Sequence, residues 1–191
     1  KQELEDQGSI FSSTSDTEVL GHLIKRQEGH MIDRICASLD KLDGAFAFLV
    51  MLEGRIYAAR DKYGLRPLSI GILSNGAYVF ASETCALDIA GAEYVRDVEP
   101  GEIIRVKDGI IKSKKYTETL PICNKLCAME YIYFSRPDSN LDGINVHTTR
   151  KLAGKQLYYE NPIEADVVIG VPDSSISAAI GYAEASGIPY E

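Results

Sequence analysis

The residues Pro172–Ser175 (PDSS) combine side chains that could hold a charged ligand. They follow a β-branched run, Val167–Val171, which suits a buried parallel strand. Ile176 then opens an apolar i, i+3, i+4, i+7 pattern, which predicts a helix packed on the sheet. The first N–H groups of a helix lack hydrogen-bond partners within the helix, so a phosphate or diphosphate is the expected ligand. Asp and Ser also cap helices without any ligand, and that alternative stays open.

Cysteine is the other residue type with possible chemistry, and the chain has Cys36, Cys85, Cys123 and Cys127. Cys123 and Cys127 are spaced C-x3-C, which is not a zinc-ribbon spacing, and only three histidines accompany them. No secretory signal is visible, so free thiols are expected rather than disulfides. Cys36 and Cys85 fall on apolar faces and are predicted to be core residues.

Composition excludes several function classes. The 191 residues carry a formal net charge of −8, which argues against sequence-independent binding of nucleic acid. Hydrophobic residues make up 45% of the chain, enough for a core, yet no apolar run reaches the ~18 residues of a membrane helix. We therefore expect a cytoplasmic protein with no membrane partner. The polar opening KQELEDQGSIF lacks Met, and we expect it to lie inside a longer protein.

The elements before residue 120 predict an α+β layer domain. Ser15 and Glu18 match a capping box, and apolar spacing predicts two helices, or one bent helix, with a break at Gly29. Turn residues at Glu53-Gly54, at 74–76 and at Asp108-Gly109 indicate antiparallel pairing. A short helix is expected over Thr84–Ala90. The expected strands are Gly44–Leu52, Arg55–Arg60, Leu68–Leu73, Ala77–Ala81, Tyr94–Val98, Gly101–Lys107 and Gly109–Lys115.

The character of the chain changes near residue 121. Met129–Phe134 (MEYIYF) reads as a strand, Ser135–Gly143 as a polar loop, and Val146–Glu160 as a helix. The PDSS stretch then completes a strand, loop, helix and next strand, which is a βαβ unit and the start of a parallel α/β sheet. The expected domains are therefore 1–121 and 122–191.

Several motifs carry a family resemblance. The chain resembles glutamine phosphoribosylpyrophosphate amidotransferases, and most of all their iron–sulfur-containing branch, over nearly its whole length. The motifs that carry the resemblance are TSDTEV (14–19), LDGAFAFLV (42–50), ARDKYGLRPLSIG (59–71), ASETCAL (81–87), CAMEYIYFSRPDS (127–139) and VIGVPDSSISAAIGYA (168–183).

The resemblance implies an incomplete α+β N-terminal nucleophile hydrolase (glutaminase type 2) domain, followed by the start of an α/β phosphoribosyltransferase domain. It implies the first committed step of purine synthesis, in which glutamine and phosphoribosylpyrophosphate give 5-phosphoribosylamine, glutamate and pyrophosphate. The family's N-terminal nucleophilic cysteine has no counterpart here, because the sequence begins at Lys1. We therefore expect an internal fragment that is inactive alone.

The resemblance also assigns site residues. Asp16 matches the aspartate that holds the α-ammonium of glutamine, and its alternative is a first-turn residue that complements the helix dipole. Asp173, Ser174 and Ser175 match the loop that receives phosphoribosylpyrophosphate, with Ser174 also contributing to Mg²⁺ binding. Cys127 matches one ligand of a 4Fe–4S cluster, which needs four thiolates. Cys123 matches no ligand position.

Other interpretations of individual residues are structural. Asp61 and Arg66 are predicted to form an ion pair, although Arg66 could instead steady the glutamine site. Residues 82–84 (Ser-Glu-Thr) are predicted to cap the short helix that follows them.

The implied partners are glutamine, phosphoribosylpyrophosphate, purine nucleotides acting as feedback inhibitors, and further copies of the chain in a homo-oligomer. Two alternative functions stay open. One is another glutamine amidotransferase, of the sugar-phosphate isomerising or asparagine synthetase type, because these share runs like DKYGLRPL. The other is a non-catalytic regulatory module, in which PDSS merely caps a helix.

Overall fold

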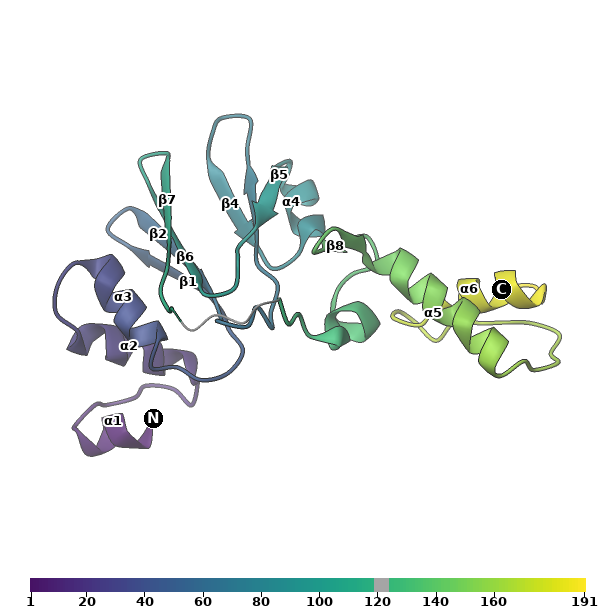
Figure 1. Cartoon of the computed structure of the whole chain (residues 1–191), viewed down its shortest axis with the longest axis horizontal. Coiled ribbons are helices and arrows are strands. Elements are labelled where there is room, and N and C mark those ends of the chain that lie inside the picture. The colour runs from purple at the N-terminus through teal and green to yellow at the C-terminus, as the bar shows by residue number, and fades with distance from the viewer. Residues whose placement is uncertain (119–123) are drawn as a thin grey trace. The chain divides into compact units, whose positions relative to one another are not determined.

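The computed structural model describes residues 1–118 and 124–191, which form two compact units (Figure 1). The first unit comprises Lys1–Gly64 and Glu99–Asn124, and the second comprises Leu65–Val98 and Lys125–Glu191. The predicted boundary between residues 121 and 122 lies outside the described residues, as does Cys123. The division into a glutaminase part and a transferase part stays a prediction.

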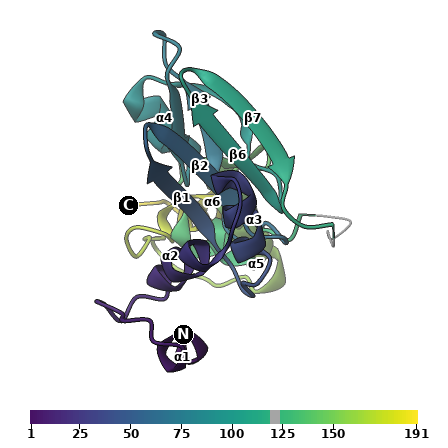
Figure 2. The same cartoon turned by 90° about the vertical axis from the view of Figure 1, so that its left-hand side faces the viewer.

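The first unit combines helices with one antiparallel sheet. Its helices are α1 (Gln2–Asp6), α2 (Thr17–Arg26) and α3 (Met31–Leu39). Its strands are β1 (Ala47–Leu52), β2 (Arg55–Arg60), β6 (Glu102–Lys107) and β7 (Ile110–Lys115), in the order β1-β2-β6-β7 (Figure 2). The predicted α+β character of this part is confirmed.

The core of the first unit lies between the sheet and the helices α2 and α3 (Figure 2). Alternate strand residues face it, because successive side chains in a strand point to opposite faces. Tyr57 and Ala59 of β2 and Ile103 of β6 are all at least 97% buried there. The helices contribute the buried residues Leu20, Ile24, Ile35, Cys36 and Leu39. Cys36 is thus a core residue, as predicted.

Two tight turns set the register of this sheet. Glu53 and Gly54 have φ angles of 50° and 70°, and Asp108 and Gly109 have 49° and 73°. Paired left-handed residues form the hairpin turns whose twist matches that of the flanking strands. Gly29, with φ at 100°, separates α2 from α3 at the predicted break.

The second unit combines a small sheet with helices. The strands β3 (Ser69–Ile72), β4 (Tyr78–Ala81) and β5 (Glu93–Asp97) pair antiparallel in the order β4-β3-β5, and α4 (Thr84–Ala90) follows β4. A π-helix, η1 (Glu130–Phe134), precedes a two-stranded ribbon of β8 (Asn140–Leu141) and β9 (Ile144–Asn145). The helices α5 (Val146–Glu160) and α6 (Ile176–Ser186) close the unit.

The strand predicted over Met129–Phe134 is wrong, because most of this run forms η1. Ser135 N–H donates to the carbonyl of Glu130 at 3.1 Å, a bond across five residues. The carboxylate of Glu130 is buried and accepts bonds from Arg66 at 2.7 Å and from the Ser135 hydroxyl at 3.0 Å. These tertiary bonds override the strand propensity of the apolar residues, since a buried carboxylate must be paired.

The parallel strand predicted over Val167–Val171 is also not formed as a strand. Its pairing is reduced to one parallel bridge between Val168 and Tyr190, and Val171 is 73% exposed. A single parallel neighbour does not bury both faces of a strand, as parallel sheets require. The following helix α6 is confirmed, yet it packs along α5 rather than on a sheet (Figure 1).

Two glycines allow this close helix pair. A Cβ on Gly154 of α5 would lie 1.8 Å from the carbonyl oxygen of Ala178, and one on Gly181 of α6 would lie 1.9 Å from that of Lys151. Real Cβ atoms do not approach backbone atoms so closely, so only glycine lets the two backbones meet here. At the rim of the pair, Glu184 binds Lys155 at 3.0 Å and also contacts Lys151.

In the parts of the chain that the structure describes, every helix is too short or too polar to cross a lipid bilayer.

Gly181→Ala should destabilise the protein by about 1–3 kcal/mol, because the added methyl group forces α5 and α6 apart. Gly21→Ala is the matched control, since Gly21 is also helical and a Cβ there meets nothing within 4 Å. That change should be neutral or stabilise by up to about 1 kcal/mol. Urea unfolding of both variants measures the difference, and equal stabilities would contradict the close packing.

Candidate functional site

The PDSS loop and the SRPDS loop, two motifs far apart in the sequence, line one cavity of about 680 Å³ in the second unit. Its walls are Tyr133, Phe134, Ser135, Arg136, Pro137, Arg150, Pro172, Asp173 and Ser174. The end of η1, the loop after it, the first half of α5 and the loop before α6 all contribute. The volume suits a small-molecule ligand.

Arg150 forms the base of this cavity. It is 96% buried, and its guanidinium donates to the carbonyl of Ser135 at 2.8 Å and to that of Tyr131 at 2.5 Å. Burial lowers the pKa of Arg150 from its usual value, with the charge of Glu83 acting in the opposite direction. Because a guanidinium stays protonated in proteins, Arg150 supplies a fixed positive charge whose orientation two carbonyls hold.

Arg136 supplies a second guanidinium at the rim of the cavity. Its side chain makes a fork with Asp138, with Nε–Oδ1 and Nη2–Oδ2 distances of 3.0 and 2.9 Å. The hydrogen bonds that Arg136 donates to Asp138 raise the pKa of Arg136. Asp138 therefore holds Arg136 in one orientation, and both side chains are exposed, so a ligand can reach them.

Glu83, before α4, holds the SRPDS loop in place. Its Oε2 accepts from the backbone N–H of Arg136 at 2.7 Å and from the hydroxyl of Ser139 at 2.8 Å. Thr84 Oγ1 accepts from the N–H of Asn140 at 2.8 Å. The prediction that residues 82–84 cap α4 is wrong for the side chain of Glu83, the N-cap residue, which makes no capping bond. This carboxylate is satisfied by the distant loop instead.

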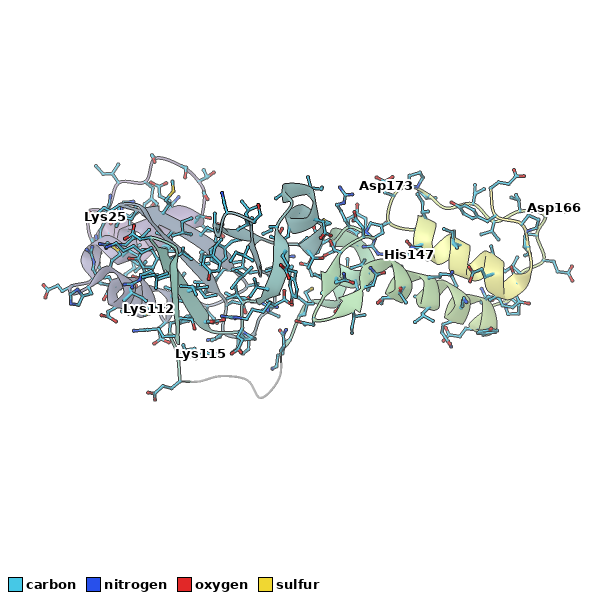
Figure 3. All side chains as sticks on the ribbon, turned by 90° about the horizontal axis from the view of Figure 1, so that it is seen from above. Lys25, Lys112, Lys115, His147, Asp166 and Asp173 are labelled. Atoms are coloured by element: carbon cyan, nitrogen blue, oxygen red, sulfur yellow. The ribbon has the colours of Figure 1, made fainter. Side chains whose placement is uncertain are left out.

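The PDSS residues lie where the motif predicts, at the start of α6. Asp173 and Ser174 line the cavity, and Asp173 extends from the loop before the helix (Figure 3). Ser175 is the N-cap of α6 without a side-chain cap, and its hydroxyl donates to the carbonyl of Val171. An adjoining apolar cavity of about 300 Å³ is lined by Ser174, Ser175 and residues of η1 and α5. Ser174 therefore lies at the junction of both cavities.

One further bond fixes α5 against α6 near this loop. A ring nitrogen of His147, Nδ1, shares a hydrogen bond of 2.9 Å with the buried hydroxyl of Ser177.

Together, these groups can bind a polyanion. Two guanidiniums and a hydroxyl offer donors for phosphate oxygens, and the unpartnered N–H groups that open a helix add to them. The carboxylate of Asp173 suits an ammonium group or a hydrated divalent cation rather than a bare phosphate. Sequence reasoning missed Arg136 and Arg150. Arg136 lies in the SRPDS motif, where the sequence indicates only a polar loop. Nothing in the sequence pattern of residues 146–160 shows that Arg150 is buried rather than solvated.

Known proteins resemble this chain over its whole length. Residues 1–88 match the family described as a glutamine amidotransferase domain. The amidophosphoribosyltransferase of Bacillus subtilis (strain 168) is 61% identical over 100% of this chain. That of Staphylococcus epidermidis (strain ATCC 12228 / FDA PCI 1200) is 48% identical, also over 100% of it.

Solved structures of similar proteins have the same fold as this chain. The glutamine phosphoribosylpyrophosphate amidotransferase from B. subtilis, complexed with ADP and GMP, superposes with a TM-score of 0.94 at 60% identity over 100% of this chain. A second structure, the allosteric regulatory enzyme of purine biosynthesis, superposes with a TM-score of 0.93 at the same identity. The resemblance to amidophosphoribosyltransferases is confirmed.

This chain spans 40% of the length of the B. subtilis amidophosphoribosyltransferase and 38% of that from S. epidermidis. Identity of this level over every described element favours amidophosphoribosyltransferases over the sugar-phosphate isomerising and asparagine synthetase types.

Asp16, the residue predicted to hold glutamine, lies in the first unit at the N-cap of α2. Its exposed carboxylate makes no capping bond, so it is available to a ligand. The predicted capping box between Ser15 and Glu18 is wrong. Glu18 instead accepts four bonds of 2.8–3.0 Å from the N–H groups and hydroxyls of Ser12 and Ser13. The carboxylate thereby folds the segment before Asp16 onto α2.

Cys127 is half-buried in the second unit, and its N–H donates to the carbonyl of Leu65 at 3.2 Å. Cys36 and Cys85 are free and buried, as predicted for core residues. Within the described ranges, no group of three or more His, Cys, Asp or Glu side chains could hold a metal ion. The ion pair predicted between Asp61 and Arg66 stays a prediction, although Arg66 has a partner in Glu130.

Glu18 should titrate far below an ordinary glutamate. The N–H of Ser12 and the hydroxyl of Ser13 lower its pKa from 4.5 to about 2. Because the folded pKa is depressed, the stabilisation by Glu18 is complete above pH 4.5 and is lost as the pH falls toward 2. NMR titration of the Glu18 side chain checks this. Ser13→Ala should raise the pKa, whereas Ser15→Ala, whose hydroxyl does not contact Glu18, should leave it unchanged.

Glu83→Ala should destabilise the protein by about 1–3 kcal/mol, because a backbone N–H and a hydroxyl lose their shared acceptor. Glu83→Gln keeps one acceptor oxygen and should cost less. Asp88→Ala removes an exposed carboxylate from the same helix and serves as the control. Guanidinium unfolding compares the three, and equal midpoints for Glu83→Ala and Asp88→Ala would refute the role of Glu83 in holding the loop.

Proposed function

We propose that the chain is part of the enzyme of the first committed step of purine synthesis. Such an enzyme converts glutamine and phosphoribosylpyrophosphate into 5-phosphoribosylamine, glutamate and pyrophosphate. One observation carries the proposal for this segment. The SRPDS and PDSS motifs, both quoted for the resemblance, line the same cavity with Arg136, Arg150 and Ser174. Identity of 48–61% to amidophosphoribosyltransferases over the length of this chain supports it.

The cavity of the second unit would receive the diphosphate end of phosphoribosylpyrophosphate. Arg150, buried and oriented by two carbonyls, would bind a phosphate oxygen without losing side-chain entropy. Arg136 would add a charge at the rim, and the Ser174 hydroxyl would donate a hydrogen bond. Pyrophosphate is the leaving group of the reaction, so groups that stabilise its developing charge favour bond cleavage as well as binding.

The second unit would begin a phosphoribosyltransferase domain with a parallel α/β sheet. The parallel bridge from Val168 to Tyr190, with α6 between the two segments, supports a βαβ crossover. The exposed side chains of Ile169 and Val171 support further parallel strands, because apolar strand residues of this kind are buried on both faces in such sheets.

The first unit would belong to the glutaminase part, which the match over residues 1–88 supports. Asp16 would bind the α-ammonium of glutamine with its exposed carboxylate. An ammonium held by a carboxylate gains charge-assisted hydrogen bonds, and the exposed end of α2 leaves room for them.

Mg²⁺ fits the proposed phosphoribosylpyrophosphate site. The loop offers the oxygen ligands that Mg²⁺ prefers, from Asp173 and Ser174, and Mg²⁺ in such sites is held chiefly by the phosphates of the substrate and by water. When bound, the ion supplies charge neutralisation of the diphosphate.

The 4Fe–4S cluster fits less well. Cys127 is a half-buried free thiol, but in the described residues no group of three or more potential ligands could hold a metal ion, and a cluster needs four thiolates. We keep Cys127 as one candidate ligand, and no step of the reaction depends on it.

The remaining partners follow from the same proposal. Purine nucleotides would act as feedback inhibitors, which the relative complexed with ADP and GMP supports. A homo-oligomer and a cytoplasmic location complete the proposal, and the three free cysteines of the described ranges are consistent with a reducing compartment.

Ser174→Ala in the full-length enzyme should weaken binding of Mg²⁺-phosphoribosylpyrophosphate by ~1–2 kcal/mol, because one hydrogen bond or metal contact is lost. This corresponds to a rise of roughly 5–30-fold in KM for that substrate, with KM for glutamine unchanged. Ser186→Ala is the control, since it removes a hydroxyl from the far end of the same helix. Steady-state kinetics with both substrates measure the effect. An unchanged KM for phosphoribosylpyrophosphate would refute the assignment of the PDSS loop.

A further inference from the structure

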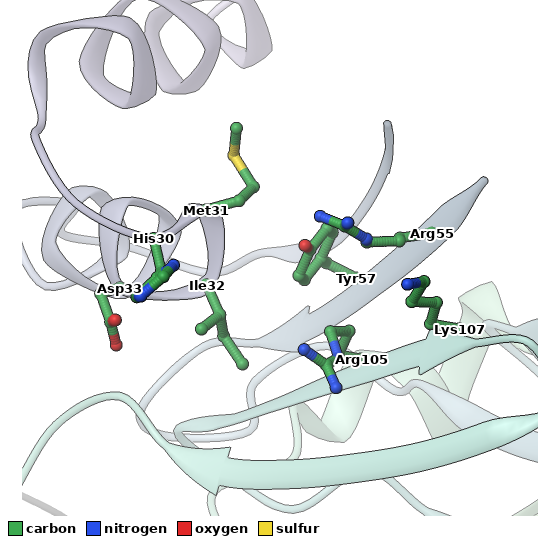
Figure 4. Close-up of a pocket in the computed structure, with 8 residues that line it drawn as sticks. All are labelled: His30, Met31, Ile32, Asp33, Arg55, Tyr57, Arg105 and Lys107. Carbon is green, nitrogen blue, oxygen red and sulfur yellow. The ribbon is translucent and has the colours of Figure 1, made fainter. Parts of the chain in front are cut away.

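A second cavity, of about 480 Å³, lies within the first unit between α3 and the sheet (Figure 4). Arg55, Tyr57, Arg105 and Lys107 line its strand side, and His30, Met31, Ile32 and Asp33 line its helix side. Figure 4 shows the strand residues on one side of the cavity and the residues of α3 on the other. None of these residues belongs to the site proposed above for phosphoribosylpyrophosphate.

The sheet brings like charges together at this cavity. Arg55 of β2 is the register partner of Lys107 of β6, and Arg105 of β6 is the partner of Lys112 of β7. Register partners in a ladder project to the same face with Cβ atoms about 4.5–5.5 Å apart. Like charges placed directly opposite each other are destabilising, so two such pairs side by side call for a counter-anion. The chain as a whole has a net charge of −8, so this group of cationic side chains is a local feature of the cavity and not of the overall composition.

The donors at this cavity are incompletely used. Arg55 Nε and Arg105 Nε are buried and have no hydrogen-bond partner among the described residues. A buried donor without an acceptor costs free energy unless a ligand or water supplies the acceptor. Arg105 also makes no ion pair within the described ranges.

The carboxylates nearby do not neutralise the cluster. Asp33 is bound by Lys114 at 2.8 Å, and that bond lowers the pKa of Asp33. The contacts from Arg55 to Glu53 at 4.0 Å and from Lys107 to Asp108 at 3.7 Å are long, and both carboxylates are exposed on hairpin turns. Exposed pairs of this kind contribute little.

We propose that this cavity binds the phosphate group of a small phosphorylated molecule. A guanidinium group can bind two oxygens of a phosphate with parallel N–H bonds. The two guanidiniums and one ammonium of this cavity therefore suit a doubly charged phosphate better than a singly charged carboxylate ligand. The volume exceeds that of a bare phosphate ion, which leaves room for an organic group against Tyr57 and Ile32. Residues of the first turn of α3, Met31–Asp33, also line the cavity, so the positive end of that helix dipole lies beside the anion.

Isothermal titration of the full-length protein with inorganic phosphate tests the proposal. Arg105→Gln should weaken one class of phosphate sites about tenfold, because charge-assisted hydrogen bonds are lost. Arg105→Lys keeps the charge but loses the fork, and should give an intermediate affinity. Lys25→Gln removes a charge from the exposed side of α2, outside the cavity, and should change the affinity less than about twofold (Figure 3).

Two further measurements separate this site from other sources of binding. Ser174→Ala should leave this class of phosphate sites intact, because the PDSS loop lies in the second unit. Acetate should compete poorly. The proposal is overturned if Arg105→Gln behaves like Lys25→Gln, or if Ser174→Ala abolishes all phosphate binding. It is also overturned if acetate displaces phosphate as well as sulfate, a tetrahedral dianion, does, since the occupant would then be a carboxylate.

Discussion

The candidate phosphoribosylpyrophosphate site depends on the carboxylate of Glu83. One oxygen of this side chain accepts both the N–H of Arg136 and the hydroxyl of Ser139, and so ties the SRPDS loop to the start of α4. A loop rich in turn formers would otherwise sample many conformations, each of which places the Arg136 guanidinium differently. The bond to Arg136 N–H fixes the backbone, and the fork with Asp138 then fixes the side chain. Backbone and side chain of one arginine are thus held by two carboxylates.

The other half of the site depends on close helix packing. Gly154 and Gly181 let α5 and α6 touch along their backbones, so Arg150 on α5 and Ser174 before α6 come to line the same cavity. Larger residues at either glycine would separate the helices and move the hydroxyl away from the buried guanidinium. Small residues far from any ligand therefore decide the geometry of the binding groups.

Local patterns predicted most helices and hairpins, because each depends on neighbours in the sequence. The helix over Thr84–Ala90 and the turn at Asp108-Gly109 formed as expected. Several of the failures lie where a distant partner decides. Glu130 turns an apolar run into a π-helix because Arg66 binds it from 64 residues away, and Glu83 binds a loop rather than its own helix. Motif matching placed Ser174 in the loop before α6, where it lines the cavity, but the burial of Arg150 could not be read from the polar pattern of its helix.

Both proposed anion sites lie in a chain whose net charge is negative, so long-range attraction would not explain binding at either of them. Each relies instead on guanidinium groups with restricted solvent access, Arg150 in the second unit and Arg105 in the first. Buried charges are screened less by salt than exposed ones, so binding there resists ionic strength. An overall negative field repels anions weakly everywhere, and only a ligand able to satisfy several oriented donors at once overcomes it. Selectivity for phosphate over simpler anions would therefore have to come from the oriented donors of each pocket, because a negative field repels a dianion more strongly than a monoanion.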